Sequence, residues 1–288
     1  VLAQFYSWEG GMRGPDFARE FLEHLKQFAP KVPSTLLPQL RFETHMLDAY
    51  KEFAALCTRY AVPYVVFNDP LPHQALAKGK RPARLTGQAL KSGRSPEAHL
   101  ELLKELHEKS GQVAAALPDL IAALGAGVLL GSHDDARAQD RHGWAAKGAA
   151  LCEFPETKEA AEAAAALGNP VIMGAPNVVR GGSHKKNISA LELIQQGLCS
   201  ALASDYHYPS PRLAALVLAK EIGLPAAWNL VSSGPAAILG LKDRGHLQPS
   251  YRADLVILEA QNQQVAACFA GGALSFISSD LAQRFFGS

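Results

Sequence analysis

One strand–helix–strand unit stands in residues 150–174, which read ALCEFPETKEAAEAAAALGNPVIMG. A short apolar run at 150–154 is followed by an alanine-rich stretch of helical period and then by a second apolar run at 170–174. Two strands joined by a helix indicate a parallel sheet, because the helix carries the chain back so that both strands run in the same direction. The unit therefore predicts an α/β protein.

The same alternation extends over most of the chain. Apolar runs that predict strands lie at 1–6, 39–43, 63–67, 127–132, 150–154, 170–174 and 201–204. About seven such repeats favour a (β/α)8 TIM-like barrel over an open doubly wound sheet. No Gly-x-Gly-x-x-Gly turn follows the first run, which also argues against a dinucleotide-binding fold.

The pattern changes near the C-terminus. Residues 251–258 and 265–269 predict a β-hairpin outside the barrel, and such a hairpin needs a partner sheet because two strands alone are marginal in water. We therefore expect a barrel over 1–238 and a small C-terminal β domain with a terminal helix over 239–288. Residues 69–95 are rich in Lys, Arg, Gly and Pro and predict an irregular segment. Ser95 predicts the N-cap of the helix that follows.

Composition excludes several classes of protein. The chain has 28 Lys and Arg against 27 Asp and Glu, so a broad basic face for nucleic acid or for an anionic membrane is not expected. No run of about 18 apolar residues and no signal-peptide pattern is present, which predicts a cytoplasmic protein. The four cysteines lie far apart in the sequence and predict reduced thiols.

Polar side chains at the predicted strand ends are the candidates for chemistry, because the carboxyl ends of barrel strands meet at one mouth. His133 follows one strand and has Asp134 beside it, as a metal ligand or a hydrogen-bonded structural histidine would. Asp205 fits a metal ligand, a base or a helix cap. Glu43 ends another strand, where a carboxylate needs a cation or several donors unless it is solvated.

The most specific stretch is 173–187, MGAPNVVRGGSHKKN. Two adjacent glycines allow a ligand to approach the backbone, and Arg180, His184, Lys185 and Lys186 supply cationic donors suited to phosphate. A flexible basic loop is the alternative. The expected partner is a small phosphorylated substrate.

These motifs together resemble the PhnM family of phosphonate-metabolism proteins in the amidohydrolase superfamily. The matching stretches occur in the family's order at 91–97, 132–135, 153–161, 173–184, 203–206, 240–245 and 252–256. The resemblance implies a metal-dependent barrel with a small β-sandwich. It also implies hydrolysis of α-D-ribose 1-methylphosphonate 5-triphosphate to the 5-phosphate and pyrophosphate.

The resemblance also assigns roles to residues. It implies that Glu43, His133 and Asp205 ligate one or two divalent metal ions, usually zinc, and that Asp205 takes the proton of the attacking water. The residues that it implies for binding the polyphosphate are Asn177, Arg180, His184 and Lys186. Further candidates are Asp69, His73, Asp134 and His207.

Two departures from the family pattern leave alternatives open. The family's His-x-His pair on its first strand is absent, so we expect the chain to begin one strand later, at Val1. Asp69 is followed by Pro70 and not by the family's histidine, although His73 is a candidate replacement. An amidohydrolase that cleaves a C–N or ester bond and a non-catalytic barrel that binds a phosphorylated ligand therefore both stand as alternatives. The sequence is also compatible with a homo-oligomer. His24, His99 and His107 are expected to be solvated on helices.

Overall fold

A computed structural model describes residues 1–182 and 187–287. Seven strands form one sheet in chain order, and every neighbouring pair is parallel. The strands are β1 (Leu2–Tyr6), β2 (Pro38–Glu43), β3 (Tyr64–Asn68), β4 (Leu129–His133), β5 (Leu151–Glu153), β6 (Val171–Gly174) and β7 (Ala201–Ala203). The seven strands predicted from the apolar runs are confirmed.

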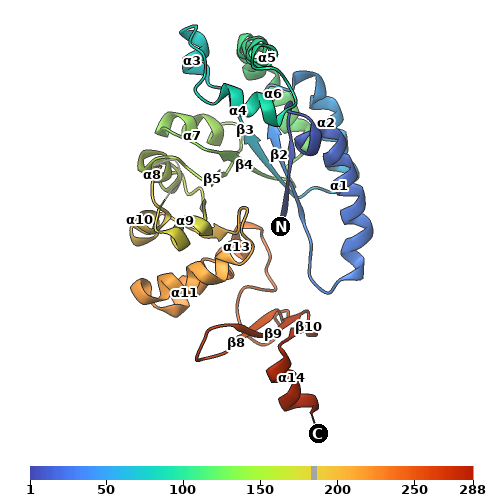
Figure 1. The fold of residues 1–288 in the computed structure, drawn as a ribbon, viewed down its shortest axis with the longest axis vertical. Coiled ribbons are helices and arrows are strands. Elements are labelled where there is room, and N and C mark those ends of the chain that lie inside the picture. The colour runs from blue at the N-terminus through green and yellow to red at the C-terminus, as the bar shows by residue number, and fades with distance from the viewer. Residues whose placement is uncertain (183–186, 288) are drawn as a thin grey trace.

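Helices cover the outer side of this curled sheet (Figure 1). The α-helices, in chain order, are α1 (Pro15–Phe28), α2 (Tyr50–Arg59), α3 (His73–Ala77), α4 (Leu85–Lys91), α5 (Pro96–Glu108), α6 (Ser110–Leu124), α7 (Ala138–Ala145), α8 (Lys158–Ala166), α9 (Ala175–Arg180), α10 (Ala190–Gln195), α11 (Ser210–Ile222), α12 (Leu224–Asn229), α13 (Ser233–Ile238) and α14 (Ser279–Phe286). Single 3-10 turns are η1 (Gly11–Arg13), η2 (Ala29–Lys31) and η3 (Leu47–Ala49). In the described part of the chain β1 and β7 are the two free edges, so the sheet is an α/β half-barrel and not a closed (β/α)8 barrel.

Alternation along each strand separates an apolar outer face from a partly polar inner face. Leu40 and Phe42 of β2 pack outward in one cluster with Phe53 of α2, and the rings of Phe42 and Phe53 lie 4.1 Å apart. Arg41 and Glu43 alternate with them and so face the inside of the curl. The inner face thereby delivers polar groups to the carboxyl ends of the strands.

Of two expectations for the connecting segments, one is wrong and one is confirmed. The stretch 69–95 is not irregular throughout, because it contains α3 and α4. Leu85 and Ala89 of α4 are buried, and Leu85 packs with Leu103 and Leu106 of α5 in a separate apolar cluster. Burial of an apolar face thus outweighs the polar composition. Ser95 caps α5 as predicted, since its side chain accepts from the Ala98 N–H at 3.1 Å.

The C-terminal β unit has a third strand that the sequence reasoning missed. Strands β8 (Leu255–Leu258), β9 (Val265–Ala270) and β10 (Ala273–Ile277) form an antiparallel sheet in the order β10-β9-β8. Gly271 and Gly272 join β9 to β10 with φ values of 58° and 81°. A two-residue turn with both φ values positive favours Gly-Gly, and this dipeptide was the signal for the missing strand.

The three histidines expected on helix surfaces differ in their exposure. His24 is exposed as expected, but His99 is fully buried beside Trp8, at 5.8 Å between ring centroids, so the expectation of a solvated His99 is wrong. His107 is half-buried against His73, at 2.8 Å between the two Nδ1 atoms.

In the described residues no helix combines the length and the apolar character that crossing a bilayer requires.

Candidate functional site

A pocket of about 300 Å³ opens at the carboxyl ends of the strands. Its lining is contributed by Arg41, His133, Asp134, Phe154, Pro155, Met173, Gly174, Pro176, Asn177, Arg180, Asn187, Ile188, Asp205 and Tyr206. Five of the residues singled out from the sequence therefore share one cavity, namely His133, Asp134, Asn177, Arg180 and Asp205. Parallel strands bring them together, since their carboxyl ends meet at one edge.

The predicted glycine-rich loop begins as a helix. Ala175–Arg180 forms α9 directly after β6, and Gly181 ends it with φ of 74°, a left-handed conformation that glycine adopts without strain. Arg180 therefore stands in the last helical turn, with its guanidinium 5.6 Å from the Tyr206 ring centroid. His184 and Lys186 lie outside the described residues.

Strained backbone gathers at this pocket. Asp134, Phe154 and Asp205 all have positive φ, at 60°, 54° and 51°. Each follows a strand of the sheet, and each lines the pocket. A non-glycine residue in the left-handed region costs on the order of 1 kcal/mol, and such residues cluster at functional sites. The left-handed backbone conformation of these residues turns the chain sharply where the strands end.

His133 is held between opposite charges. Its Nδ1 lies 2.9 Å from Asp134 Oδ1, and its Nε2 lies 2.9 Å from Arg41 Nη1 and 3.7 Å from Glu153 Oε2. Burial lowers the pKa of Arg41, while the carboxylates of Asp134, Glu153 and Glu43 act in the opposite direction. The sequence reasoning missed Arg41 and Glu153, although strand alternation places Arg41 on the same face as Glu43.

Asp205 follows β7, lines the pocket and is exposed to solvent. Desolvation by the pocket walls raises its pKa although the residue remains in contact with solvent, while His133 and Arg41 oppose the shift. A carboxylate with a raised pKa is a better proton acceptor. Asp205 thus stands next to two cationic side chains, Arg41 and Arg180, that contribute to its electrostatic environment.

Glu43 does not line the pocket. Its carboxylate is buried, with 2% of the residue exposed, and accepts hydrogen bonds from the Ser7 hydroxyl and, at 3.2 Å, from the Trp8 N–H. Burial raises the pKa of Glu43 to about 7, and the Ser7 hydrogen bond opposes that rise. The Glu43 carboxylate is therefore bonded to neutral donors, away from the pocket that holds His133 and Asp205.

Two other candidates have structural surroundings. Asn177 lines the pocket, but its side-chain Oδ1 accepts from the Ala190 N–H at 3.1 Å and so ties α9 to α10. His207 is exposed and is not among the lining residues; its carbonyl accepts from the Ser210 hydroxyl at 2.6 Å. The structure brings Asn177 to the pocket and leaves His207 outside it.

Asp69 and His73 meet in a second cluster, together with a residue that sequence reasoning missed. His73 Nε2 is 2.8 Å from Asp69 Oδ2, and His45 Nδ1 is 3.6 Å from Asp69 Oδ1. His45 lies two residues beyond the end of β2 and Asp69 one residue beyond β3. Position directly after neighbouring strands was the available signal for His45.

A metal ion does not fit the predicted set of Glu43, His133 and Asp205 in this arrangement. A tetrahedral zinc site brings its ligand atoms to within about 3.4 Å of one another. In the described part of the chain, the group whose ligand atoms all lie within 4.8 Å is His45, Asp69 and His73. The Arg41 guanidinium, in addition, occupies the approach to His133 Nε2. The role of the three residues as ligands stays a prediction.

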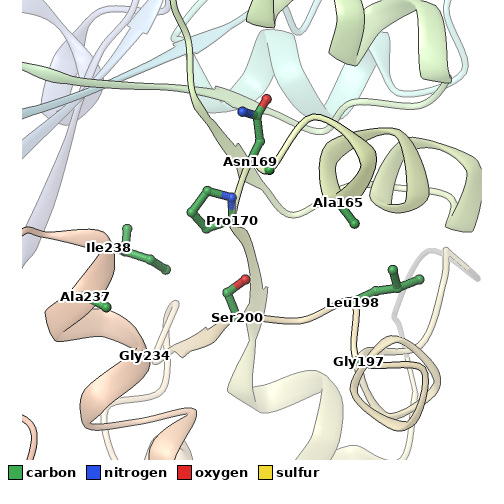
Figure 2. A pocket seen from close by; sticks show the side chains of 10 residues that line it. Ala165, Asn169, Pro170, Gly197, Leu198, Ser200, Gly234, Ala237 and Ile238 are labelled. Atoms are coloured by element: carbon green, nitrogen blue, oxygen red, sulfur yellow. The ribbon is translucent and has the colours of Figure 1, made fainter.

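A larger cavity of about 410 Å³ lies at the opposite, amino ends of β6 and β7. Figure 2 shows Asn169, Pro170 and Ser200 around it, with Ile238 of α13 on the other side. Its lining contains no titratable side chain. Since acid–base or nucleophilic chemistry needs such groups, size alone does not make this cavity the active site.

Comparison with curated proteins finds a partial match. The sequence is 43% identical over 146 residues to the alpha-D-ribose 1-methylphosphonate 5-triphosphate diphosphatase of Escherichia coli (strain K12). These residues are 48% of this chain and 38% of the relative, so the chain covers well under two thirds of that protein. No family model matches the sequence. The match supports the family resemblance drawn from the motifs.

Comparison with solved structures identifies the fold. An N-acetylglucosamine-6-phosphate deacetylase from Pasteurella multocida superposes with a TM-score of 0.50 at 13% identity, over 95% of this chain and 84% of that one. An uncharacterized protein also gives 0.50, at 10% identity, over 81% of this chain and 60% of that one. At these identities the likeness shows the α/β fold alone.

Proposed function

We propose that this chain belongs to a hydrolase of the PhnM type, acting on a small phosphorylated substrate. The reaction would be hydrolysis of α-D-ribose 1-methylphosphonate 5-triphosphate to the 5-phosphate and pyrophosphate. One observation carries the proposal: a single pocket joins Asp205 with Arg41, His133 and Arg180. The partial identity to the diphosphatase supports this choice of substrate.

The charges of the pocket suit phosphoryl transfer. Arg41 and Arg180 supply guanidinium donors for polyphosphate oxygens and offset negative charge that develops on them. Asp205 accepts the proton of an attacking water, whose oxygen forms a bond to phosphorus. The bond from that phosphorus to the leaving oxygen breaks, and pyrophosphate departs with the electron pair. Asp134 Oδ1 lies 2.9 Å from Nδ1 of His133 at the pocket wall.

The family resemblance implies a divalent ion, expected to be zinc, although the ligand atoms of Glu43, His133 and Asp205 do not converge to hold one in this arrangement. No step of this mechanism passes through such an ion, because two of the atoms that would bind it already have hydrogen-bond partners. His133 Nε2 is bonded to Arg41, and the Glu43 carboxylate is bonded to Ser7. The pocket's own acid–base and cationic groups carry the steps above.

Release of pyrophosphate from the ribosyl triphosphate tests the proposal. Asp205→Asn should lower kcat by about 10²–10⁴-fold, and Arg180→Gln should lower kcat/KM by about 10²–10³-fold. Arg59→Gln, an exposed arginine on α2 outside the pocket, is the matched control and should leave turnover unchanged. No release by the wild-type chain, or equal rates in all three variants, would contradict the proposal.

The hydrogen bond between Arg41 and His133 favours a second candidate, a non-catalytic protein that binds a phosphorylated ligand without turning it over. It predicts thermal stabilisation by the ribosyl triphosphate that persists in a chelator and is lost in Arg180→Gln. Stabilisation without pyrophosphate release would select this candidate over the hydrolase.

A further inference from the structure

We propose that His45, Asp69 and His73 form a binding site for a divalent transition-metal ion, separate from the pocket, with His107 positioning His73. Potential ligand atoms of the first three residues all lie within 4.8 Å of one another. None of the four residues lines the pocket that contains Asp205. The inference therefore stands apart from the proposed function.

Four different segments build this cluster. His45 follows β2, Asp69 follows β3, His73 begins α3 and His107 lies in the last turn of α5. Figure 1 shows α3 and α5 close together near the top of the view, while α9 of the pocket lies at the left of the molecule. An ion here would join loops that follow two neighbouring strands to a helix that packs over them.

The hydrogen bonds of His45 determine which nitrogen is available. The Ser110 hydroxyl donates to the His107 carbonyl at 2.6 Å, so its oxygen acts as an acceptor toward His45 Nε2, 3.3 Å away. Nε2 therefore carries the hydrogen, and the lone pair of Nδ1 points toward Asp69 Oδ1 at 3.6 Å. The Thr44 hydroxyl, 3.5 Å from Nδ1, is at the outer limit of a hydrogen bond.

His73 is held at both nitrogens. Its Nε2 lies 2.8 Å from Asp69 Oδ2, and its Nδ1 lies 2.8 Å from His107 Nδ1. When His73 donates its Nδ1 hydrogen to His107, its Nε2 presents a lone pair to the Asp69 carboxylate. A cation bound to that lone pair and to Oδ2 would take the place of the Nε2 hydrogen, which donates to the carboxylate in the other tautomer. A histidine whose other nitrogen is held by a neighbour is the usual arrangement around a bound metal.

Ligand types and exposure indicate the class of ion. Two imidazoles and one carboxylate suit zinc and neighbouring transition metals, and three protein ligands leave a further coordination position for water. The His45 side chain is 2% exposed, whereas those of Asp69 and His73 are 35% and 34% exposed, so an ion can enter from solvent. The Leu71 N–H, 3.2 Å from Asp69 Oδ1, already orients the carboxylate.

Titration of the metal-stripped full chain with Co²⁺ tests the inference, since tetrahedral cobalt bound to nitrogen and oxygen gives visible d–d absorption. The wild-type chain should bind one equivalent at this site. His73→Gln and Asp69→Asn should each weaken that binding by at least about 100-fold, and His107→Leu by about 10–100-fold. Zn²⁺ should displace the cobalt and raise the Tm of the wild-type chain.

Two control variants locate the ion. His24→Gln changes an exposed histidine on α1, and His133→Asn changes the pocket; both should keep the cobalt equivalent. Circular dichroism and the Tm in a chelator show whether each variant is folded. Unchanged binding in folded His73→Gln and Asp69→Asn would overturn the inference, as would loss of the equivalent in His133→Asn. Pyrophosphate release is measured separately, so failure of the proposed hydrolysis does not alter this result.

Discussion

Arg141 is a fully buried charge bonded to residues on either side of His133 and Asp134 in the chain. Its guanidinium donates to Ser132 Oγ at 2.7 Å and to the Leu151 carbonyl at 3.0 Å, and it pairs with buried Asp135 at 3.2 Å. These bonds connect α7 to β4 and β5, and Ser132 directly precedes His133 in β4. A buried charge that loses its partner is costly, because water cannot replace that partner.

Arg141→Met should therefore lower the free energy of unfolding by about 3–5 kcal/mol, because Asp135 is left buried and unpaired. Arg137→Met removes an exposed arginine paired with Asp140 at 2.6 Å, and should cost at most about 1 kcal/mol. Urea denaturation monitored by circular dichroism gives both values. Equal losses in the two variants would show that burial of the pair does not matter.

Glu43 predicts a pH dependence of stability. Its pKa is about 7 in the folded protein against an ordinary value of 4.5, so the folded state binds more protons between these pH values. The free energy of unfolding should therefore fall as the pH rises from 4.5 to 7, by about 3 kcal/mol from this group.

Glu43→Gln should abolish that fall and make the protein more stable above pH 7. Denaturation in a chelator at several pH values measures the slope, and Glu20→Gln, at an exposed position on α1, is the control. A slope that persists in Glu43→Gln would assign the effect to another group.

At the scale of elements, Ser95 is the N-cap of α5, the helix that carries His107 of the cluster with His45, Asp69 and His73. Ser95→Ala removes the acceptor for the Ala98 N–H and should cost about 1 kcal/mol, whereas Ser95→Asp should be nearly neutral because a carboxylate also caps. Thermal denaturation of the three proteins measures the difference. Equal losses in Ala and Asp variants would mean that the side chain acts through something other than capping.

At the scale of the whole molecule, the thiols report global unfolding. Cys57, Cys152 and Cys199 are buried, and burial raises the pKa of Cys57 and of Cys199 to about 12. All four cysteines are free, which agrees with the reduced thiols expected from their spacing. The protein should react quickly with a thiol reagent only at half-buried Cys268 while folded, and at all four positions in denaturant.

Absorbance of the released thiol chromophore, with and without guanidinium, counts the reactive groups. Fast reaction of three or four thiols in the native protein would show that the apolar cluster around Cys57 and the one around Cys152 and Cys199 open without global unfolding. Cys268→Ser is the control, since it should remove the fast reaction and leave the slow ones.

The sequence by itself determined the seven strands of the parallel sheet and their order along the chain. Apolar runs at regular spacing indicated all seven strands of the sheet, and Ser95 followed by Pro96 indicated the start of α5, because these signals are local. Strand ends also indicated that His133 and Asp205 would share one edge of a parallel sheet. The division into 1–238 and 239–288 remains a prediction.

Only the tertiary structure decided which polar groups touch. Arg41 reaches His133, Ser7 reaches Glu43, and His107 reaches His73, across separations of 92, 36 and 34 residues. Side-chain contacts of this kind depend on the curvature of the sheet and on the helices packed around it, and no local pattern encodes either. For that reason the sequence could propose ligands by type, while the fold decided that, among residues 1–182 and 187–287, His45, Asp69 and His73 converge.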